Sequence, residues 1–199
     1  DYNNSIREYI RNFIMSKLET NTIDTVSGTA NLTIGGANTS TVTLPSGEVT
    51  GHMYPAFAVN LNAEQSISSS SFTKVNFDTE IFDTAGAYDN STNYRFTVPS
   101  GQAGKYKFYF DLSAKSSSDD LTYIISALYK NGSLTKRSET NTNGASNAKF
   151  RVFQVIASAI LDLSVGDYVE AYAYIVGTSP VVQAQTANRS YFEGYRIGS

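Results

Sequence analysis

The sequence predicts an all-β fold, and three observations favour it. The chain of 199 residues holds 14 Tyr and 11 Phe, while only 17% of its residues are charged. Ser, Thr, Asn and Gly are plentiful, which is typical of strands joined by many turns. Between residues 88 and 110, aromatic and polar residues alternate on both sides of a break that contains Pro99, Gly101 and Gly104. This period of two around a turn signal predicts two half-buried antiparallel strands.

The first element, residues 1–20, is predicted to be one amphipathic helix. Its apolar residues recur at helical spacing, with charged residues between them. They include Ile6, Ile10, Phe13 and Leu18. A single helix of this length is marginal in water, so we expect it to pack against symmetry mates or a neighbouring protein. The alternative is that it lies on its own head domain.

Residues 21–52 are predicted to form a β-rich stalk. Short alternating stretches occur at 31–34 and 41–44, each followed by a turn signal. Two such strands cannot form a stable sheet alone. The texture resembles the β-rich stalks of phage fibre and virion proteins, in which three chains share one slender core. A disordered linker is the alternative interpretation.

From about residue 53 to residue 199, the aromatic patterning becomes dense. Eight strands are expected there, near 55–60, 72–83, 94–98, 104–113, 121–130, 150–163, 168–176 and 190–197. This region carries five ordered motifs, which are Pro55 to Val59, Tyr88 to Phe108, Leu128 to Gly132, Leu161 to Val169 and Phe192 to Ile197.

These motifs resemble the globular head domain of complement component q, which is related to tumour necrosis factor. The resemblance implies a ten-strand-type jelly-roll sandwich that assembles as a homotrimer. The chain departs from the family in having no cysteine. It also lacks an upstream collagen repeat, so an animal immune or hormone role is not implied.

The residues also favour a trimer without the resemblance. The strands near 121–130, 150–163 and 168–176 are apolar on both faces, whereas a solvated outer face should be polar. A symmetric oligomer is the usual way to cover such faces. Tyrosines recur on one face of the strands near 121–130 and 168–176. The predicted trimer interface contains Tyr123, Tyr129, Tyr172 and Tyr174. The alternative is that the helix of the same chain covers one sheet.

Strand alternation predicts which links lie far from the stalk. Counting from the strand at Pro55, the links 99–103, 131–149 and 177–189 fall at the far end, and 84–93, 114–120 and 164–167 fall near the stalk. Long loops on a rigid scaffold are common binding sites. The candidate receptor-binding residues of these apex loops are Lys136, Arg137, Asn141, Asn143, Gln183, Gln185 and Arg189.

No catalytic, cofactor or metal site is predicted. The single histidine, His52, lacks a nucleophile beside it, and no phosphate loop or zinc spacing occurs. Asp119 and Asp120 could contribute to a calcium site, but an exposed acidic turn near the stalk is preferred. Asp78, Glu80 and Asp83 could supply a glycosidase pair only if folding brought two carboxylates together.

The expected function is therefore that of a non-enzymatic structural protein of a virion, displayed on the surface of a bacteriophage. Its trimeric fibre head would attach to a host-surface glycan or protein, and its N-terminal segment would bind other virion proteins. The net charge of −3 argues against nucleic-acid binding, and no membrane insertion is expected. The alternatives are a capsid-decorating or head-fibre protein whose head is purely structural, and a glycan-cleaving fibre tip.

Overall fold

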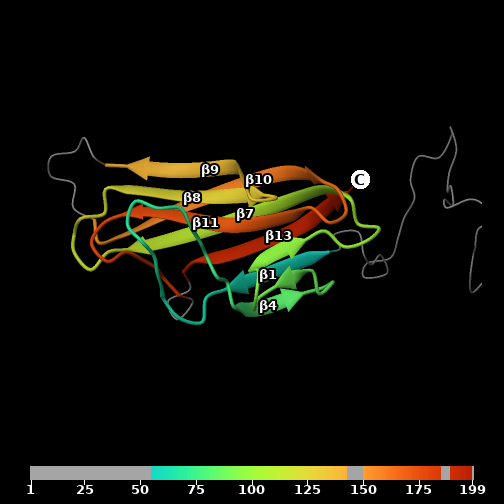
Figure 1. Cartoon of the computed structure of the whole chain (residues 1–199), viewed down its shortest axis with the longest axis horizontal. Helices are drawn as coiled ribbons and strands as arrows, with labels where there is room; N and C mark the ends of the chain where they lie inside the picture. Colours follow the sequence, from blue (N-terminus) through green and yellow to red (C-terminus); the bar gives the residue numbers. More distant parts are fainter. Residues whose placement is uncertain (1–54, 143–149, 185–188, 199) are drawn as a thin grey trace, which may run out of the picture. The chain divides into compact units, whose positions relative to one another are not determined.

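Two antiparallel sheets face each other across an aromatic core in the computed structural model (Figure 1). The structure describes residues 55–142, 150–184 and 189–198, which belong to the unit Val49–Ser199. Every regular element of these residues is a strand, as the sequence predicts. The predicted helix over 1–20, with Ile6, Ile10, Phe13 and Leu18, and the predicted stalk over 21–52 lie outside the described residues.

Sheet A is built around the long strand β7. β7 (Gly104–Lys115) pairs along its whole length with β10 (Val152–Leu163), and on its other side with β13 (Tyr191–Gly198). β13 pairs in turn with β1 (Ala56–Asn60), which pairs with β4 (Thr79–Asp83). Two short strands complete the sheet beside the end of β7, namely β12 (Val181–Val182) and β2 (Gln65–Ser66). β10 therefore forms one edge of sheet A.

Sheet B is built around β11 (Tyr168–Val176), which pairs with β8 (Tyr123–Lys130) along its length. β8 pairs with β9 (Ser133–Asn141), which forms the outer edge. The other side of β11 carries three short strands, β6 (Arg95–Thr97), its neighbour β5 (Tyr88–Asp89) and β3 (Thr73–Lys74).

The core between the sheets is aromatic. Along β7, Tyr106, Phe108 and Phe110 all point inward and are fully buried, which confirms the predicted alternation. The Phe57 ring stacks on Phe96 from the opposite sheet, with ring centroids 5.1 Å apart. Such rings bury large apolar areas and pack with defined geometry, so the two sheets are held at one distance and in one register.

The direction of β1 defines two ends of the sandwich. We call the end at which β1 begins, at Ala56, the proximal end, and the end at which it finishes, at Asn60, the distal end. Ala56 lies opposite Tyr195, and Asn60 lies opposite Tyr191. By the same register, the link 164–167 after β10 is proximal, as predicted.

Two predicted links lie at the wrong ends. The link 99–103 was predicted at the end far from the stalk, but it is proximal. The link 116–122, which overlaps the link 114–120 predicted near the stalk, is distal. The cause is the strand β5, which is two residues long and was not expected. Each strand left out of the prediction reverses the expected direction of all strands after it. The equally unexpected β9 reverses it again, so the segment after Val176 is distal, as predicted.

Candidate assembly and binding surfaces

The outer face of sheet A carries exposed aliphatic side chains. On β10, Val152, Ile156 and Ile160 alternate with inward residues and are 38%, 42% and 61% exposed. Large apolar side chains of β4 and β13 share this face. We call this surface the aliphatic face, and its members are Phe82, Val152, Ile156, Ile160 and Tyr195. Large apolar side chains that are exposed on one face of a sheet mark a candidate interaction site.

A row of polar side chains crosses the same face beside Ile156. Asn60, Tyr191 and Asp111 are opposite one another on β1, β13 and β7. The Oδ1 atoms of Asn60 and Asp111 are buried and have no hydrogen-bond partner within the described chain. A buried acceptor without a donor costs about 1–3 kcal/mol. The row therefore holds two buried acceptor atoms that the described chain leaves unsatisfied.

The electrostatics of this row agree with its burial. Burial raises the pKa of Asp111, although hydrogen bonds with Gln154 and Tyr191 oppose the change. Burial, followed by the charge of Asp111, raises the pKa of Tyr191 to about 12. The Tyr191 hydroxyl consequently stays protonated at neutral pH and can donate a hydrogen bond.

The four tyrosines predicted for the trimer interface lie on the outer face of sheet B. They form two packed pairs, with centroids 4.1 Å apart for Tyr129 and Tyr172 and 5.6 Å apart for Tyr123 and Tyr174. Phe72, which comes just before β3, packs on the rings of Tyr174 and Tyr129 at 5.2 Å and 6.1 Å. We call these five residues the tyrosine face. Phe72 begins the strand predicted near 72–83, but no local pattern in the sequence links it to the tyrosines of β8 and β11.

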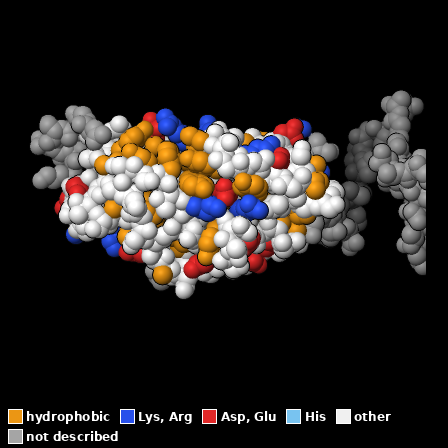
Figure 2. All heavy atoms as spheres, viewed as in Figure 1, with side chains coloured by type: hydrophobic (Ala, Val, Ile, Leu, Met, Phe, Trp, Pro, Cys, Tyr) orange, Lys and Arg blue, Asp and Glu red, His pale blue; other side chains and the backbone are white. Residues whose placement is uncertain are grey.

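Figure 2 shows hydrophobic side chains gathered over β8, β9 and β11, with basic and acidic side chains beside them. Two ion pairs flank the tyrosine face. Lys74 Nζ lies 2.5 Å from Glu170 Oε1, and Arg137 Nε lies 3.1 Å from Glu139 Oε2. The charges beside the tyrosine face are thus paired within the chain.

The distal end is organised by Asp120. Its carboxylate accepts hydrogen bonds from the hydroxyls of Ser116 and Thr178 at 2.5 Å each, and from the Thr178 backbone N–H. These bonds lower the pKa of Asp120. Asp119, by contrast, is exposed and lies 3.8 Å from Arg151. The pair predicted beside the stalk is therefore distal, and Asp120 ties two distal loops together.

Two of the predicted receptor-binding residues are used inside the fold. Gln183 is buried, and its Oε1 accepts hydrogen bonds from the Ser113 hydroxyl at 3.0 Å and from Arg189 Nη1. The Gln183 amide also donates to Glu64 at 3.4 Å. Gln183 and Arg189 therefore stabilise the distal end of sheet A, which corrects the prediction that Gln183 lies in a solvated loop.

The predicted loop 131–149 is in large part a strand. Ser133–Asn141 forms β9, so Lys136, Arg137 and Asn141 lie on the edge of sheet B rather than in an apex loop. Their side chains are exposed, and that of Arg137 pairs with Glu139. Asn143 and Gln185 lie outside the described residues. A receptor-binding role for this set stays a prediction.

The carboxylates considered for catalysis serve local structure. Asp78 Oδ1 accepts the Asn62 backbone N–H at 2.8 Å, and Asp83 Oδ2 accepts that of Tyr88 at 2.7 Å. Glu80 is exposed on β4. Within the described residues, no group of three or more His, Cys, Asp or Glu side chains could hold a metal ion. His52 lies outside them.

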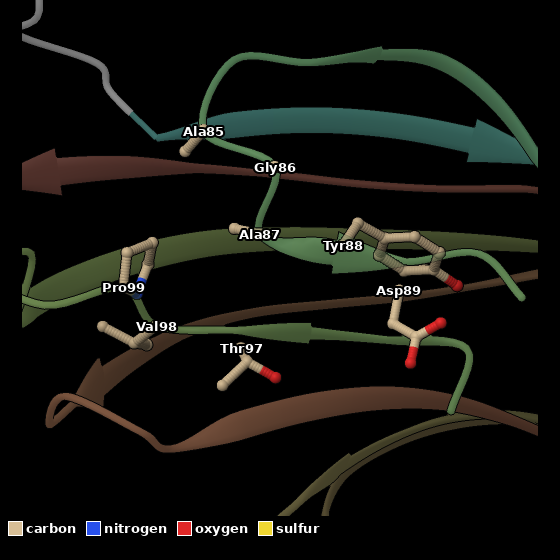
Figure 3. A pocket seen from close by; sticks show the side chains of 8 residues that line it. All are labelled: Ala85, Gly86, Ala87, Tyr88, Asp89, Thr97, Val98 and Pro99. Carbon is tan, nitrogen blue, oxygen red and sulfur yellow. The ribbon is translucent and has the colours of Figure 1, made fainter. Parts of the chain in front are cut away.

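A pocket of about 320 Å³ opens between the β4–β5 link and the end of β6 (Figure 3). Small side chains and backbone line most of it, including Ala85, Gly86 and Pro99. The Tyr88 ring stacks on Phe57 at 5.1 Å. The Asp89 carboxylate accepts backbone hydrogen bonds from residues 91–93, which hold its pKa well below its usual range. The Tyr88 hydroxyl is buried and has no hydrogen-bond partner within the described chain.

Comparison with known proteins agrees with this architecture. Residues 56–197 match the C1q domain family, and the chain belongs to that family. Domains of this fold are typically non-enzymatic binding domains and typically assemble as trimers. No curated protein matches the chain. Within the described residues, no helix is long and apolar enough to cross a membrane.

Three similar solved structures are distant in sequence. The globular domain of a zebrafish complement 1qA protein is 21% identical, with a TM-score of 0.48 over 72% of this chain and 97% of that one. The Eiger tumour necrosis factor of S. frugiperda is 11% identical, with a TM-score of 0.47 over 73% and 92%. Murine APRIL is 8% identical, with a TM-score of 0.49 over 71% and 98%.

Proposed function

We propose that the chain is the trimeric head of a virion fibre, that it is not an enzyme, and that it attaches the particle to a host-surface ligand. The observation that carries the proposal is the aliphatic face. An isolated chain would leave Ile156 and Ile160 in water beside two buried acceptors that have no donor. A second and third copy of the chain would cover these exposed side chains.

A copy of the same chain suits this face better than a small ligand does. The exposed side chains extend from the edge strand β10 to β4 on the far side of the sheet. An interface of that breadth is typical of stable oligomers, which bury apolar patches at their centre. Closed symmetry lets one patch on each copy be covered without leaving a further patch exposed.

The virion context rests on the sequence. The amphipathic pattern over 1–20 and the stalk-like texture over 21–52 support attachment at one end of the molecule. In a trimer, each distal loop and each copy of sheet B is presented three times. Three weak contacts on one rigid body can bind strongly through avidity.

Ile160→Asp in the full chain tests the assembly. A charge in an apolar contact costs several kcal/mol, so we expect the wild type to sediment at three times the chain mass and the variant to sediment as smaller species. Leu134→Asp is the matched control, because Leu134 is also exposed but lies on β9. A wild-type monomer, or loss of the trimer in the control alone, would contradict assembly through the aliphatic face.

Adsorption of the purified protein to host cells tests the attachment. We expect wild-type trimers to adsorb and to compete with intact particles for the host surface. Trimers that form normally but never adsorb would favour a capsid-decorating role with a structural head. Tyr172→Asp, measured beside Ile160→Asp, tells whether the predicted tyrosine contact or the aliphatic face joins the copies.

A further inference from the structure

We propose that the tyrosine face of sheet B is a binding site for an uncharged glycan. This inference deepens the proposed function and rests on it, since assembly through the aliphatic face leaves sheet B free. The two outer faces differ in chemistry. On β10 of sheet A, the exposed side chains of Val152, Ile156 and Ile160 are aliphatic, whereas four of the five residues of the tyrosine face carry a hydroxyl.

The rings of the tyrosine face are held in place. Tyr172 and Tyr174 alternate on β11, and their positions lie opposite Ala127 and Ile125 of β8. Both of these β8 side chains are buried. The Tyr129 and Tyr172 rings stack within 28° of parallel, so each ring holds the other in place. A rigid ring loses little conformational entropy on binding, which is why tyrosine is frequent in recognition surfaces.

The charges beside the rings favour an uncharged ligand. Lys74 is paired with Glu170, whose side chain is only 5% exposed, and Arg137 is paired with Glu139. The Tyr123 hydroxyl donates a hydrogen bond to Glu139, and this bond raises the pKa of Tyr123. A charged ligand would have to break one of these pairs and leave a partner uncompensated. A neutral ligand meets a surface whose local charge is already balanced.

The hydroxyl groups favour a sugar over a purely apolar ligand. Tyrosine hydroxyls are protonated at neutral pH and can donate as well as accept. Burial raises the pKa of Tyr129 and of Tyr172 further. A pyranose ring has an apolar C–H face and a rim of hydroxyls. It can therefore stack on an aromatic side chain while its rim exchanges hydrogen bonds with the tyrosine hydroxyls.

Affinity electrophoresis of the full chain tests the site. The probes are three neutral polysaccharides, dextran, mannan and galactan, with acidic alginate for comparison. We expect at least one neutral polysaccharide to retard the wild type and alginate not to do so. Tyr172→Ala should weaken that binding about tenfold because a stacking surface is lost. Tyr172→Phe keeps the ring and should weaken it less. Val165→Ala, at an exposed position in the turn between β10 and β11, should bind as the wild type does.

Sedimentation of the same samples separates this inference from the proposed function. A trimer that none of the neutral polysaccharides retards overturns the glycan site and leaves the trimeric head standing. Equal binding by wild type and Tyr172→Ala overturns the glycan site as well. Dissociation of the Tyr172→Asp variant into monomers also overturns it, since a second copy of the chain would then occupy this face. A wild-type monomer that binds through Tyr172 supports the site while contradicting the proposed assembly.

Discussion

Gly194 on β13 has no room for a side chain. A Cβ at this position would lie 2.7 Å from Phe108 Cδ1 and 2.9 Å from Phe57 Cε1, and both rings are fully packed in the core. The predicted motif that closes the chain contains this glycine, and the structure supplies the physical reason for it.

Gly194→Ala should therefore destabilise the fold. Forcing one methyl group into a packed core costs about 1–3 kcal/mol, so we expect a clear drop in the midpoint of thermal unfolding. Gly198→Ala is the control, because nothing lies within 4 Å of a Cβ there. Equal midpoints for the two variants would mean that the Phe57 and Phe108 rings can move apart freely.

Single residues also show where the sequence is a poor guide. Gln183 sits in a stretch that reads as a polar loop, yet it is buried because Ser113 and Arg189 satisfy its amide oxygen. No local pattern reveals that partner set, since Ser113 is 70 residues away in the chain. Burial of a polar side chain depends on tertiary hydrogen bonds, and periodicity carries no information about them.

The turn between β10 and β11 is fixed by Asp167. Its carboxylate accepts the Ser164 backbone N–H at 2.9 Å and the Asn131 amide at 2.7 Å, and it lies 2.8 Å from Lys130 Nζ. The bonds from Lys130 and Asn131 are the main cause that lowers the pKa of Asp167 to about 2. The carboxylate thus joins the β10–β11 turn to the β8–β9 turn.

The effect of Asp167 on stability should depend on pH. Because its pKa is lower in the folded state, the contribution is complete above the unfolded pKa of about 4 and is lost as the pH falls towards 2. Asp167→Asn should unfold a few degrees below the wild type at pH 7. The gap should narrow on acidification, as followed by thermal melts at pH 7, 4 and 2.5. A gap that stays constant with pH would show that the carboxylate's charge does not contribute.

At the scale of strands, the sequence predicts those with a strong apolar period. β7, β10 and β11 lie within one or two residues of their expected bounds, because core residues alternate along each of them. β9 escapes prediction because Leu134 is its one large apolar residue and its partner β8 supplies the pairing. An edge strand exposed to water has no need of an apolar face, so it leaves little trace in the sequence.

At the scale of the molecule, the two outer faces divide the tasks that the sequence predicts for one trimeric head. Sheet A carries aliphatic side chains and unsatisfied buried acceptors, and sheet B carries packed aromatic rings flanked by paired charges. Apolar periodicity detects both faces equally. Apolar periodicity does not show which face contacts a second copy of the chain. That distinction depends on how neighbouring strands place polar groups beside the apolar ones.

The head should fold and assemble without the first 49 residues. Within the described residues, the core cluster runs from Phe57 to Phe192, and these side chains are enclosed by the two sheets. A chain that begins at Thr50 keeps this core, the aliphatic face and the tyrosine face. We therefore expect it to remain rich in strands by far-ultraviolet circular dichroism and to sediment as a trimer. The same chain should no longer attach to the particle, because Ile6, Ile10, Phe13 and Leu18 are gone. If the shortened chain fails to fold, the first 49 residues supply part of the core, and the predicted boundary near residue 52 is wrong.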